Sequence, residues 1–183
     1  MLEAENDHIL KAQKGDNQSF GLLYDHYVKK IYRFIFLKVS SRQEAEDLTH
    51  EVFLSAWQKL PNFKIKGFPF SSWLYRIARN RVIDHYRTSK KHIDLDALGD
   101  TLEKHFLQDS ENHFDRIDID IDIKKIKKAI SQLNENQQEI IQMRFIEDLS
   151  PKEISQILIR KEGTIRIIQH RAIEKIKKIL DNQ

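Results

Sequence analysis

The sequence predicts an all-α protein made of two small helical domains joined by a flexible linker. Only five glycines and three prolines occur in 183 residues, and strands would need the turns that these residues make. Apolar residues recur at helical spacing in both halves of the chain. Residues 91–123 differ from both halves, because ten acidic residues stand there against few basic ones and the apolar pattern is irregular. We therefore expect domains at residues 1–90 and 124–183 and an acidic linker at residues 91–123.

The composition excludes several classes of protein. The chain has no cysteine, which removes disulfides, thiolate metal sites and cysteine nucleophiles and suits a reducing cytoplasm. The formal net charge is only +3, so a nucleic-acid interface has to come from local clusters of charge. The richest apolar run, residues 31–39, is interrupted by Arg33 and Lys38, and the first residues have no signal-peptide pattern. We expect a soluble cytoplasmic protein without a cofactor.

Four helices are predicted in the first domain. Gly15 is suited to end the first helix, since glycine readily caps a helix C-terminus. Ser41 and Glu44 have the spacing of a capping box, and the helix that they begin should stop before Pro61. A loop follows, and a fourth helix begins near Ser71. The residues expected to face the core of these helices are Phe20, Leu23, Tyr24, Tyr27, Ile31, Phe34, Leu48, Val52, Ala56, Leu60, Leu74, Ile77, Ala78 and Val82.

The second domain is predicted to end in a helix-turn-helix. Ser150 and Glu153 form a second capping box, with Pro151 at the favoured first position of a short helix. A break at residues 160–163 separates it from a longer basic helix, which is the order of elements in a helix-turn-helix. Upstream, Ile126, Ile130 and Leu133 form one stripe, and Asn134 is placed to cap a helix that holds Ile140, Ile141 and Phe145.

The last helix has the residue types of a DNA-reading helix. Arginine binds guanine edges, glutamine binds adenine edges and lysine contacts phosphates, and the N-terminal part of a recognition helix faces the bases. Arg166, Gln169 and His170 are therefore candidates for base contacts, and Arg171, Lys175 and Lys178 for phosphate contacts. The same face could also be the solvated side of an ordinary surface helix, and the pattern leaves this open.

A second cluster interleaves aromatic and basic residues between positions 63 and 87. Rings stack on unpaired bases and cations follow the backbone, so this mixture suits single-stranded nucleic acid. The alternative is that several of the rings belong to the core, which we favour for Trp73. The cluster contains Phe63, Lys64, Lys66, Phe68, Phe70, Trp73, Tyr75, Arg76, Arg79, Asn80, Arg81, Tyr86 and Arg87.

The third cluster is acidic and lies on the helix that follows Ser41: Glu44, Glu46, Asp47 and Glu51, with His50 among them. A zinc-protease motif starting at His50 fails because position 54 is leucine. A di-iron motif from Asp47 and His50 fails because no second copy exists on another helix. A calcium loop at residues 118–129 lacks the required glycine and glutamate. A solvated acidic face and a face that binds a basic partner both remain.

These motifs together resemble the extracytoplasmic-function sigma factors of bacterial RNA polymerase. Ala12 to Tyr27 resembles the opening of that family, Ala45 to Trp57 its polymerase-binding helix, and Phe70 to Arg87 its promoter-melting helix. Three further stretches resemble its C-terminal helix-turn-helix, and these are Leu133 to Phe145, Leu149 to Ile154 and Gly163 to Ala172. The resemblance covers nearly the whole chain except the linker. It is specific because four motifs occur in the order that the family has.

The resemblance implies that residues 1–90 are sigma region 2, which binds core polymerase and helps to recognise and melt the −10 element. It implies that residues 124–183 are region 4, which recognises the −35 element. It implies that RNA polymerase core (its clamp coiled coil and flap), promoter DNA and an anti-sigma factor are partners. The protein would be no enzyme. The residues assigned to polymerase are Glu46, Asp47, Leu48, Glu51 and Phe53, those assigned to −10 DNA are Phe63, Lys64, Lys66, Phe68, Arg76, Asn80, Asp84 and Arg87, and those assigned to −35 DNA are Arg166, Gln169, His170, Arg171 and Lys175.

The chain departs from the family pattern in the helix-turn-helix. The glycine often found in the turn is replaced around Ile159-Arg160, and two isoleucines occur in Ile165-Arg166-Ile167-Ile168, where the family often has Val-Lys-Ser-Arg. These departures leave the −35 sequence open. Two other functions also remain as alternatives: a free-standing helix-turn-helix regulator, and a metal-dependent hydrolase using Asp47, His50 and Glu51.

Overall fold

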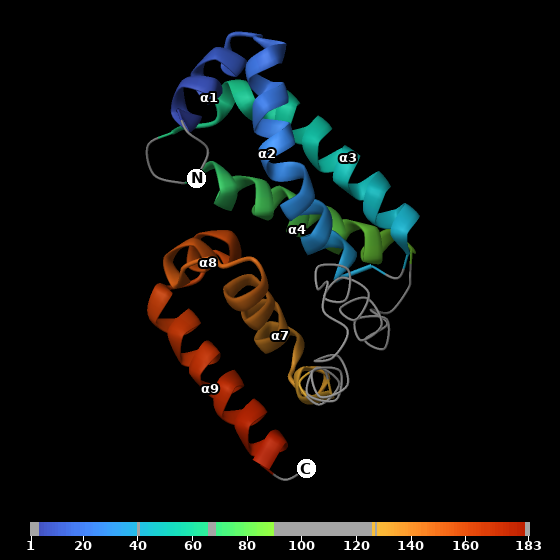
Figure 1. Cartoon of the computed structure of the whole chain (residues 1–183), viewed down its shortest axis with the longest axis vertical. Coiled ribbons are helices and arrows are strands. Elements are labelled where there is room, and N and C mark those ends of the chain that lie inside the picture. Colours follow the sequence, from blue (N-terminus) through green and yellow to red (C-terminus); the bar gives the residue numbers. More distant parts are fainter. Residues whose placement is uncertain (1–3, 40, 66–68, 90–125, 127, 182–183) are drawn as a thin grey trace, which may run out of the picture. The chain divides into compact units, whose positions relative to one another are not determined.

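All the regular secondary structure in the described part of the protein is helical. The computed structural model describes residues 4–39, 41–65, 69–89, 126 and 128–181, and no strand occurs among them. The chain divides into two compact units, Met1–Ile93 and Asp94–Gln183 (Figure 1). The prediction of an all-α protein with two helical domains is confirmed. The acidic segment predicted as the linker, residues 91–123, lies outside the described residues.

The first unit begins and ends its helices close to the predicted signals. Gly15, just after the first helix, has a φ of 93°, the left-handed conformation expected of a glycine C-cap. The Asp16 carboxylate caps the next helix by accepting a hydrogen bond from the backbone N–H of Gln18 at 3.1 Å. The Ser41 hydroxyl accepts one from the N–H of Glu44, also at 3.1 Å. The elements are α1 (Glu5–Gln13), α2 (Asn17–Phe36), α3 (Arg42–Lys59), the 3-10 turn η1 (Leu60–Asn62) and α4 (Phe70–Ser89).

Helix α2 lies at the centre of the first unit and contacts α1, α3 and α4 (Figure 1). Most of the stripe that the helical spacing predicted is buried, and Leu23, Ile31 and Phe34 each have no exposed surface. Phe20 and Tyr24 of the same stripe are half-buried. Aromatic rings from the start of α4 extend the core, since the rings of Phe70 and Tyr27 lie 5.6 Å apart. This packing holds the first turns of α4 against α2.

A side chain from α1 also fixes the chain that leads to α4. The amide nitrogen of Gln13 donates hydrogen bonds to the carbonyl oxygens of Leu60, at 3.0 Å, and Phe63, at 2.7 Å. Backbone carbonyls that helices leave free at their C-terminal ends need such partners. Gln13 therefore joins the first helix to the residues that follow α3.

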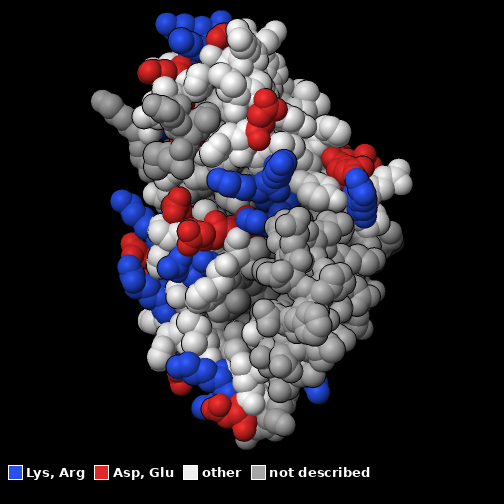
Figure 2. All heavy atoms as spheres, viewed as in Figure 1, with Lys and Arg blue, Asp and Glu red and all other residues white. Residues whose placement is uncertain are grey.

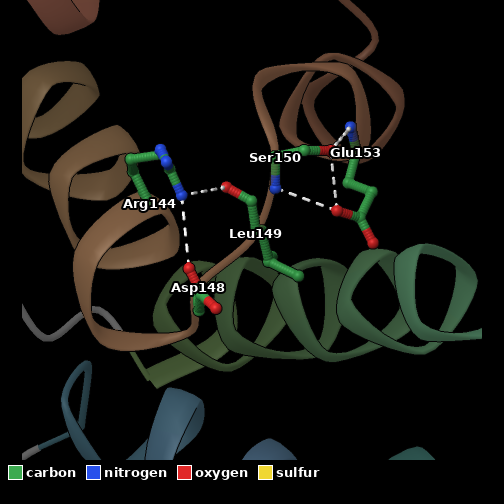
Figure 3. A network of polar contacts seen from close by, with 5 residues as sticks. All are labelled: Arg144, Asp148, Leu149, Ser150 and Glu153. Carbon is green, nitrogen blue, oxygen red and sulfur yellow. Dashed lines mark hydrogen bonds and ion pairs between the residues drawn. The ribbon is translucent and has the colours of Figure 1, made fainter. Parts of the chain in front are cut away.

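In the second unit the caps were also predicted correctly. Asn134 and Gln137 form a reciprocal capping box at the start of α7, and Ser150 and Glu153 form another at the start of α8. Figure 3 shows the Glu153 carboxylate accepting hydrogen bonds from the Ser150 backbone and hydroxyl at 2.8 and 2.7 Å. The elements are α7 (Glu135–Ile141), the π-helical turn η2 (Gln142–Ile146), α8 (Pro151–Leu158) and α9 (Glu162–Asp181).

Helix α9 completes the core of the second unit by packing against α7 and α8. Ala172 is fully buried beside Leu133 and Ile141, and Ile130, Ile173 and Ile176 pack around these three. Ile165, at the N-terminal end of α9, is also fully buried. The short α8, the break and the long basic α9 form the predicted helix-turn-helix.

Two residues of this unit depart from the predicted helical pattern. Phe145 was expected in one helix with Ile140 and Ile141, but the α-helix ends at Ile141, and Phe145 lies in the π-helical turn with its side chain 59% exposed. Ile126 is likewise 44% exposed and does not continue the buried stripe of Leu133.

The turn between α8 and α9 is one residue earlier than predicted. The reversal falls at Ile159, which has φ 53° and ψ 49°, and α9 already begins at Glu162. A β-branched residue rarely adopts this left-handed conformation. Glycine, which the resembled family often has around this position, would adopt the conformation without strain. Across the described residues, no helix combines the length and hydropathy that spanning a membrane requires.

Candidate nucleic-acid and partner interfaces

The outer face of α3 is acidic. Glu46, Asp47 and Glu51 are exposed, together with His50. Glu46 pairs with Arg42 one turn earlier, at 2.8 Å between Nε and Oε1. Among the residues that the structure describes, Asp47 has no hydrogen bond or ion pair, so its charge is the least compensated of the three.

The acidic face of α3 borders α4 at one edge through two polar contacts. Arg81 Nη1 lies 3.6 Å from Glu51 Oε2, and His85 Nε2 lies 3.9 Å from Glu44 Oε1. The later residue of α4 meets the earlier residue of α3, so the two helices run antiparallel. The contacts fix which face of α4 remains open.

Two residues assigned to polymerase binding from the sequence are core residues. Leu48 and Phe53 are each 5% exposed, and the Phe53 ring meets the Tyr24 ring edge-on at 4.7 Å. Their side chains therefore hold α3 against α2. The apolar residue on the outer face is Leu54, which is 60% exposed. Its spacing of seven from Asp47 and three from Glu51 is the sequence signal that could have identified it.

The open face of α4 carries the residues assigned to the −10 element. Asn80, Asp84 and Arg87 are exposed and Arg76 is half-buried, at the spacing of one helical face. Arg87 Nη2 pairs with Asp84 Oδ1 at 3.1 Å. Ile83 lies on the same face and is 46% exposed. The structure thus brings these four assigned residues together on one side of a single helix.

The loop before α4 differs from the prediction at Phe63. Its side chain is 9% exposed, and its ring lies 4.8 Å from that of Trp73 and 5.6 Å from that of Phe70. The ring is therefore part of the aromatic cluster and does not project for stacking, whereas Lys64 is exposed. The packing role favoured for Trp73 agrees with these contacts. Lys66 and Phe68, also assigned to the −10 element, lie outside the described residues.

The exposed face of α9 is mainly basic. Arg166, His170, Arg171 and Lys175 are exposed and Gln169 is half-buried. Arg166 pairs with Glu162, with Nε and Nη2 at 3.1 and 2.6 Å from Oε1. Lys175 donates a hydrogen bond to the backbone carbonyl of Gln132. Arg171 has no such partner within the described part of the chain, so its guanidinium is available to a ligand.

A network at the entrance to α8 fixes the helix-turn-helix (Figure 3). Arg144 Nη1 lies 3.3 Å from Asp148 Oδ1 and donates to the Leu149 carbonyl at 3.4 Å. Asp148 itself has a left-handed φ of 51°. These contacts join the π-helical turn to the capping box of Ser150 and so set where α8 begins.

The surface charges are mixed on a larger scale. On the face in view in Figure 2, Lys and Arg side chains are interspersed with Asp and Glu side chains, in keeping with the small net charge. Basic residues that could attract DNA are therefore clustered locally, as on the exposed face of α9. No three histidine or acidic residues of the described ranges are grouped as a metal site would require, and Glu51 of the proposed hydrolase set is paired with Arg81.

Both units match models of known protein regions. Residues 23–92 match Sigma-70 region 2, and residues 129–178 match Sigma-70 region 4. The first match begins within α2, at residue 23, and includes α3 and α4. The second includes α7, α8 and α9 up to residue 178.

Curated relatives match along nearly the whole chain. The ECF RNA polymerase sigma factor SigW of Bacillus subtilis is 32% identical, with 94% of each chain covered. The RNA polymerase sigma-H factor of Pseudomonas aeruginosa is 33% identical, with 98% of this chain and 96% of the relative covered. The ECF sigma factor BldN of Streptomyces coelicolor is 34% identical over 94% of this chain, which spans 64% of the length of BldN.

Two solved structures share the fold. The structure of CnrH in complex with the cytosolic domain of CnrY has a TM-score of 0.67 at 20% identity and covers 98% of this chain and 99% of that one. The sigma factor RpoE of Bartonella quintana, in complex with the anti-sigma factor NepR, has a TM-score of 0.63 at 21% identity and covers 90% and 98%.

The fold and the matched regions define a sigma factor of bacterial type, with region 2 and region 4. The chain belongs to the family of ECF RNA polymerase sigma factors. Its function is accordingly to direct RNA polymerase to promoters, which a free-standing regulator without region 2 would not do. Its relatives are sigma factors, which are not enzymes.

Proposed function

We propose that each of the three exposed helical faces makes a different contact during transcription initiation. The acidic face of α3 binds core polymerase, the open face of α4 engages and helps to melt the −10 element, and the basic face of α9 reads the −35 element in the major groove. The observation that carries this proposal is the opposite charge of α3 and α9. An acidic face suits a basic protein surface, and a basic face suits DNA.

The α3 contact centres on Asp47 and on Leu54 beside it. Asp47 is exposed and has no ion pair among the described residues, and the side chain of Leu54 is 60% exposed. An apolar side chain within a charged rim is the usual composition of a protein interface. Leu48 and Phe53 support the contact from beneath by fixing the orientation of α3. The proposed partner surface is the clamp coiled coil of the polymerase, with the flap as the partner of the second unit.

The α4 contact combines Arg76, Asn80, Asp84 and Arg87 with Lys64 of the preceding loop. Arg76 and Arg87 supply charge for the phosphate backbone, and Asn80 and Asp84 supply hydrogen-bonding groups for bases. Phe63 anchors this loop through its ring contacts with Phe70 and Trp73. We include Lys66 and Phe68 in the same contact on the strength of their sequence positions.

The α9 contact uses Arg166, Gln169 and His170 for bases and Arg171 and Lys175 for phosphates. Two modest contacts at a fixed spacing give specificity, because holding the first raises the effective concentration of the second. We propose an anti-sigma factor as a further partner, since structurally similar sigma factors are found in such complexes. We also propose that the protein acts in the cytoplasm, where its relatives work with the polymerase.

The division of labour can be tested by finding the step at which each variant fails. The variants are Asn80→Ala on α4 and Arg171→Ala on α9, each assembled with cognate core polymerase on a promoter selected from a pool of fragments. Arg171→Ala should weaken closed-complex binding, measured on duplex DNA. Asn80→Ala should spare that binding and reduce strand opening, measured as permanganate reactivity of unpaired thymines.

The matched control is Asn17→Ala, which removes an exposed asparagine of the same unit from the start of α2. It should affect neither step. Equal loss of closed-complex binding in the Asn80 and Arg171 variants would contradict the division. Failure of the folded, unaltered protein to bind core polymerase without its inhibitor would contradict the α3 assignment as well.

A further inference from the structure

One apolar side chain interrupts the basic face of α9. Ile167 is 54% exposed, whereas Ile165 two residues earlier is fully buried. With 3.6 residues per turn, Ile167 lies about 60° from His170 and about 40° from Arg171 around the helix axis. It therefore sits among the residues proposed to contact DNA, on the side away from the core. The core of the second unit does not explain an isoleucine at this position.

The residue one turn earlier leaves the side chain of Ile167 uncovered. Gly163 is helical, its φ is not positive, and a Cβ built on it would meet no atom within 4 Å. Neither its backbone conformation nor packing within the protein requires glycine, which is a poor helix former. Side chains of a helix lean toward its N-terminus, so the methyl groups of Ile167 lie over the turn of Gly163. Glycine there keeps this side of the helix open to a closely approaching partner.

The chemistry of Ile167 restricts what it can recognise in DNA. The side chain has no donor or acceptor, so it can neither bind a phosphate nor pair with a polar base edge. The major groove offers one apolar group, the 5-methyl group of thymine, which apolar side chains contact. The N-terminal part of a recognition helix faces the base edges, and Ile167 is the sixth residue of α9. Its flanking basic residues make DNA the favoured partner over an apolar protein surface.

We propose that Ile167 is a specificity-determining residue that reads a thymine methyl group in the −35 element. The inference rests on the proposed function of α9 and adds to it one position at which the element must carry thymine. Burial of one methyl group changes affinity about fourfold. The promoter preference of this sigma factor would thus include an apolar contact beside its charged ones.

The experiment replaces each thymine of the −35 element in turn by deoxyuridine, which removes only the 5-methyl group. The probe is a promoter fragment selected by the holoenzyme from a random pool, and the quantity measured is the dissociation constant of the holoenzyme on the duplex. We expect one replacement to weaken binding about fourfold. Holoenzyme with Ile167→Ala should bind the thymine and deoxyuridine fragments equally.

The matched control is Ile126→Ala, which removes an isoleucine of similar exposure from the same unit but outside α9. It should keep the full sensitivity to deoxyuridine. Because Ile167 is exposed and alanine is the better helix former, its variant should fold, and the far-ultraviolet circular dichroism spectrum checks this. Gly163→Ala should be at least as stable as the unaltered protein yet bind the fragment more weakly.

Three outcomes would overturn this inference alone. The first is a holoenzyme that selects a −35 element but tolerates deoxyuridine at every thymine. The second is an Ile167→Ala variant that retains the sensitivity. The third is an Ile167→Ala variant that fails to assemble with core polymerase before DNA is added, which would make Ile167 a protein contact. If instead no −35 element is selected at all, and Arg171→Ala has no effect, both this inference and the proposed role of α9 are wrong.

Discussion

Arg81 of α4 lies 3.6 Å from Glu51 of α3, so the acidic residues on the face of α3 differ in whether a cation neutralises them. Glu51 already has a cationic partner within the protein, whereas Asp47 one turn earlier has none in the described part of the chain. The side chains of the pair are 41% and 53% exposed, so the pair itself contributes little to stability. Its effect is to leave Asp47 as the carboxylate most available to a partner.

Reversing the charge of Asp47 should therefore disrupt assembly with core polymerase. Asp47→Lys places a cation on a face proposed to meet a basic surface, and like charges at an interface are strongly unfavourable. We expect at least a tenfold weaker dissociation constant for core binding, measured by fluorescence anisotropy of a labelled sigma factor. The matched control Asp25→Lys reverses an exposed acid on α2 and should bind normally. Equal weakening in both variants would mean that total charge, and not the α3 face, determines assembly.

Removing Arg166 should cost promoter affinity in a sequence-dependent way. Arg166 lies early in α9 and is held by Glu162 in the free protein. Arg166→Ala should cost about 1–3 kcal/mol on the preferred −35 element if the side chain binds a guanine edge. Titration of the holoenzyme on the preferred and on single-base variant fragments measures this. A uniform loss on every fragment, with a smaller dependence on salt, would assign Arg166 to a phosphate instead.

Replacing Ile159 by glycine should stabilise the second unit. Ile159 adopts a left-handed conformation that costs an ordinary residue about 1–2 kcal/mol. Its side chain is 71% exposed, so little burial is lost. Part of the gain is offset by the greater freedom of glycine in the unfolded chain, and we expect a net gain of about 0.5–1 kcal/mol.

Hydrogen exchange of the α8 and α9 amide groups provides the measurement for this substitution. Ile159→Ala is the control, because alanine keeps the Cβ atom that is strained in this conformation. It should not increase protection. If alanine and glycine stabilised the unit equally, removal of the exposed isoleucine and not relief of backbone strain would be the cause.

The first unit should lose stability in weak acid through His26. Burial lowers the pKa of His26 below its usual value of 6.5, the nearby Lys30 lowers it further, and Glu5 partly opposes them. Its Nε2 atom is buried without a hydrogen-bond partner among the described residues. The unfolded chain therefore binds a proton more readily than the folded one.

The sign of the effect follows from that difference. The stability associated with a neutral His26 is complete above pH 6.5 and is lost as the pH falls through the lowered pKa of the folded state. Urea denaturation at several pH values, followed by the fluorescence of Trp57 and Trp73, should show a steeper loss in the unaltered protein than in His26→Gln. Identical pH dependence in the two proteins would remove His26 as the cause.

Local chemistry made much of this fold predictable. The capping residues Ser41, Asn134 and Ser150 satisfy backbone groups of their own helices, so their sequence spacing was sufficient to place helix starts. The buried stripe of α2 was predicted for the same reason, because a regular helix turns each position by a fixed angle. The all-α class and the helix-turn-helix followed from these signals.

The errors occurred where distant contacts decide the conformation. Phe145 lies in the π-helical turn after Ile141 and is exposed. No local sequence pattern predicted that the α-helix would change to a π-helical turn there. Phe63 has the sequence context of an exposed loop residue, yet rings from α4 cover it. For the interfaces, sequence spacing grouped Asn80 with Asp84 and placed Leu48 on the buried face of its helix, but it could not show that Glu51 is paired with Arg81.

The hydrogen bonds from Gln13 to the carbonyls of Leu60 and Phe63 determine how far the first unit can be truncated from its N-terminal end. The region 2 match begins at residue 23, in the middle of α2. A truncation at that boundary would remove Gln13 and the buried Ile9 with it. A fragment that keeps these contacts therefore starts at α1, and the backbone at Leu60 and Phe63 is tethered to that helix.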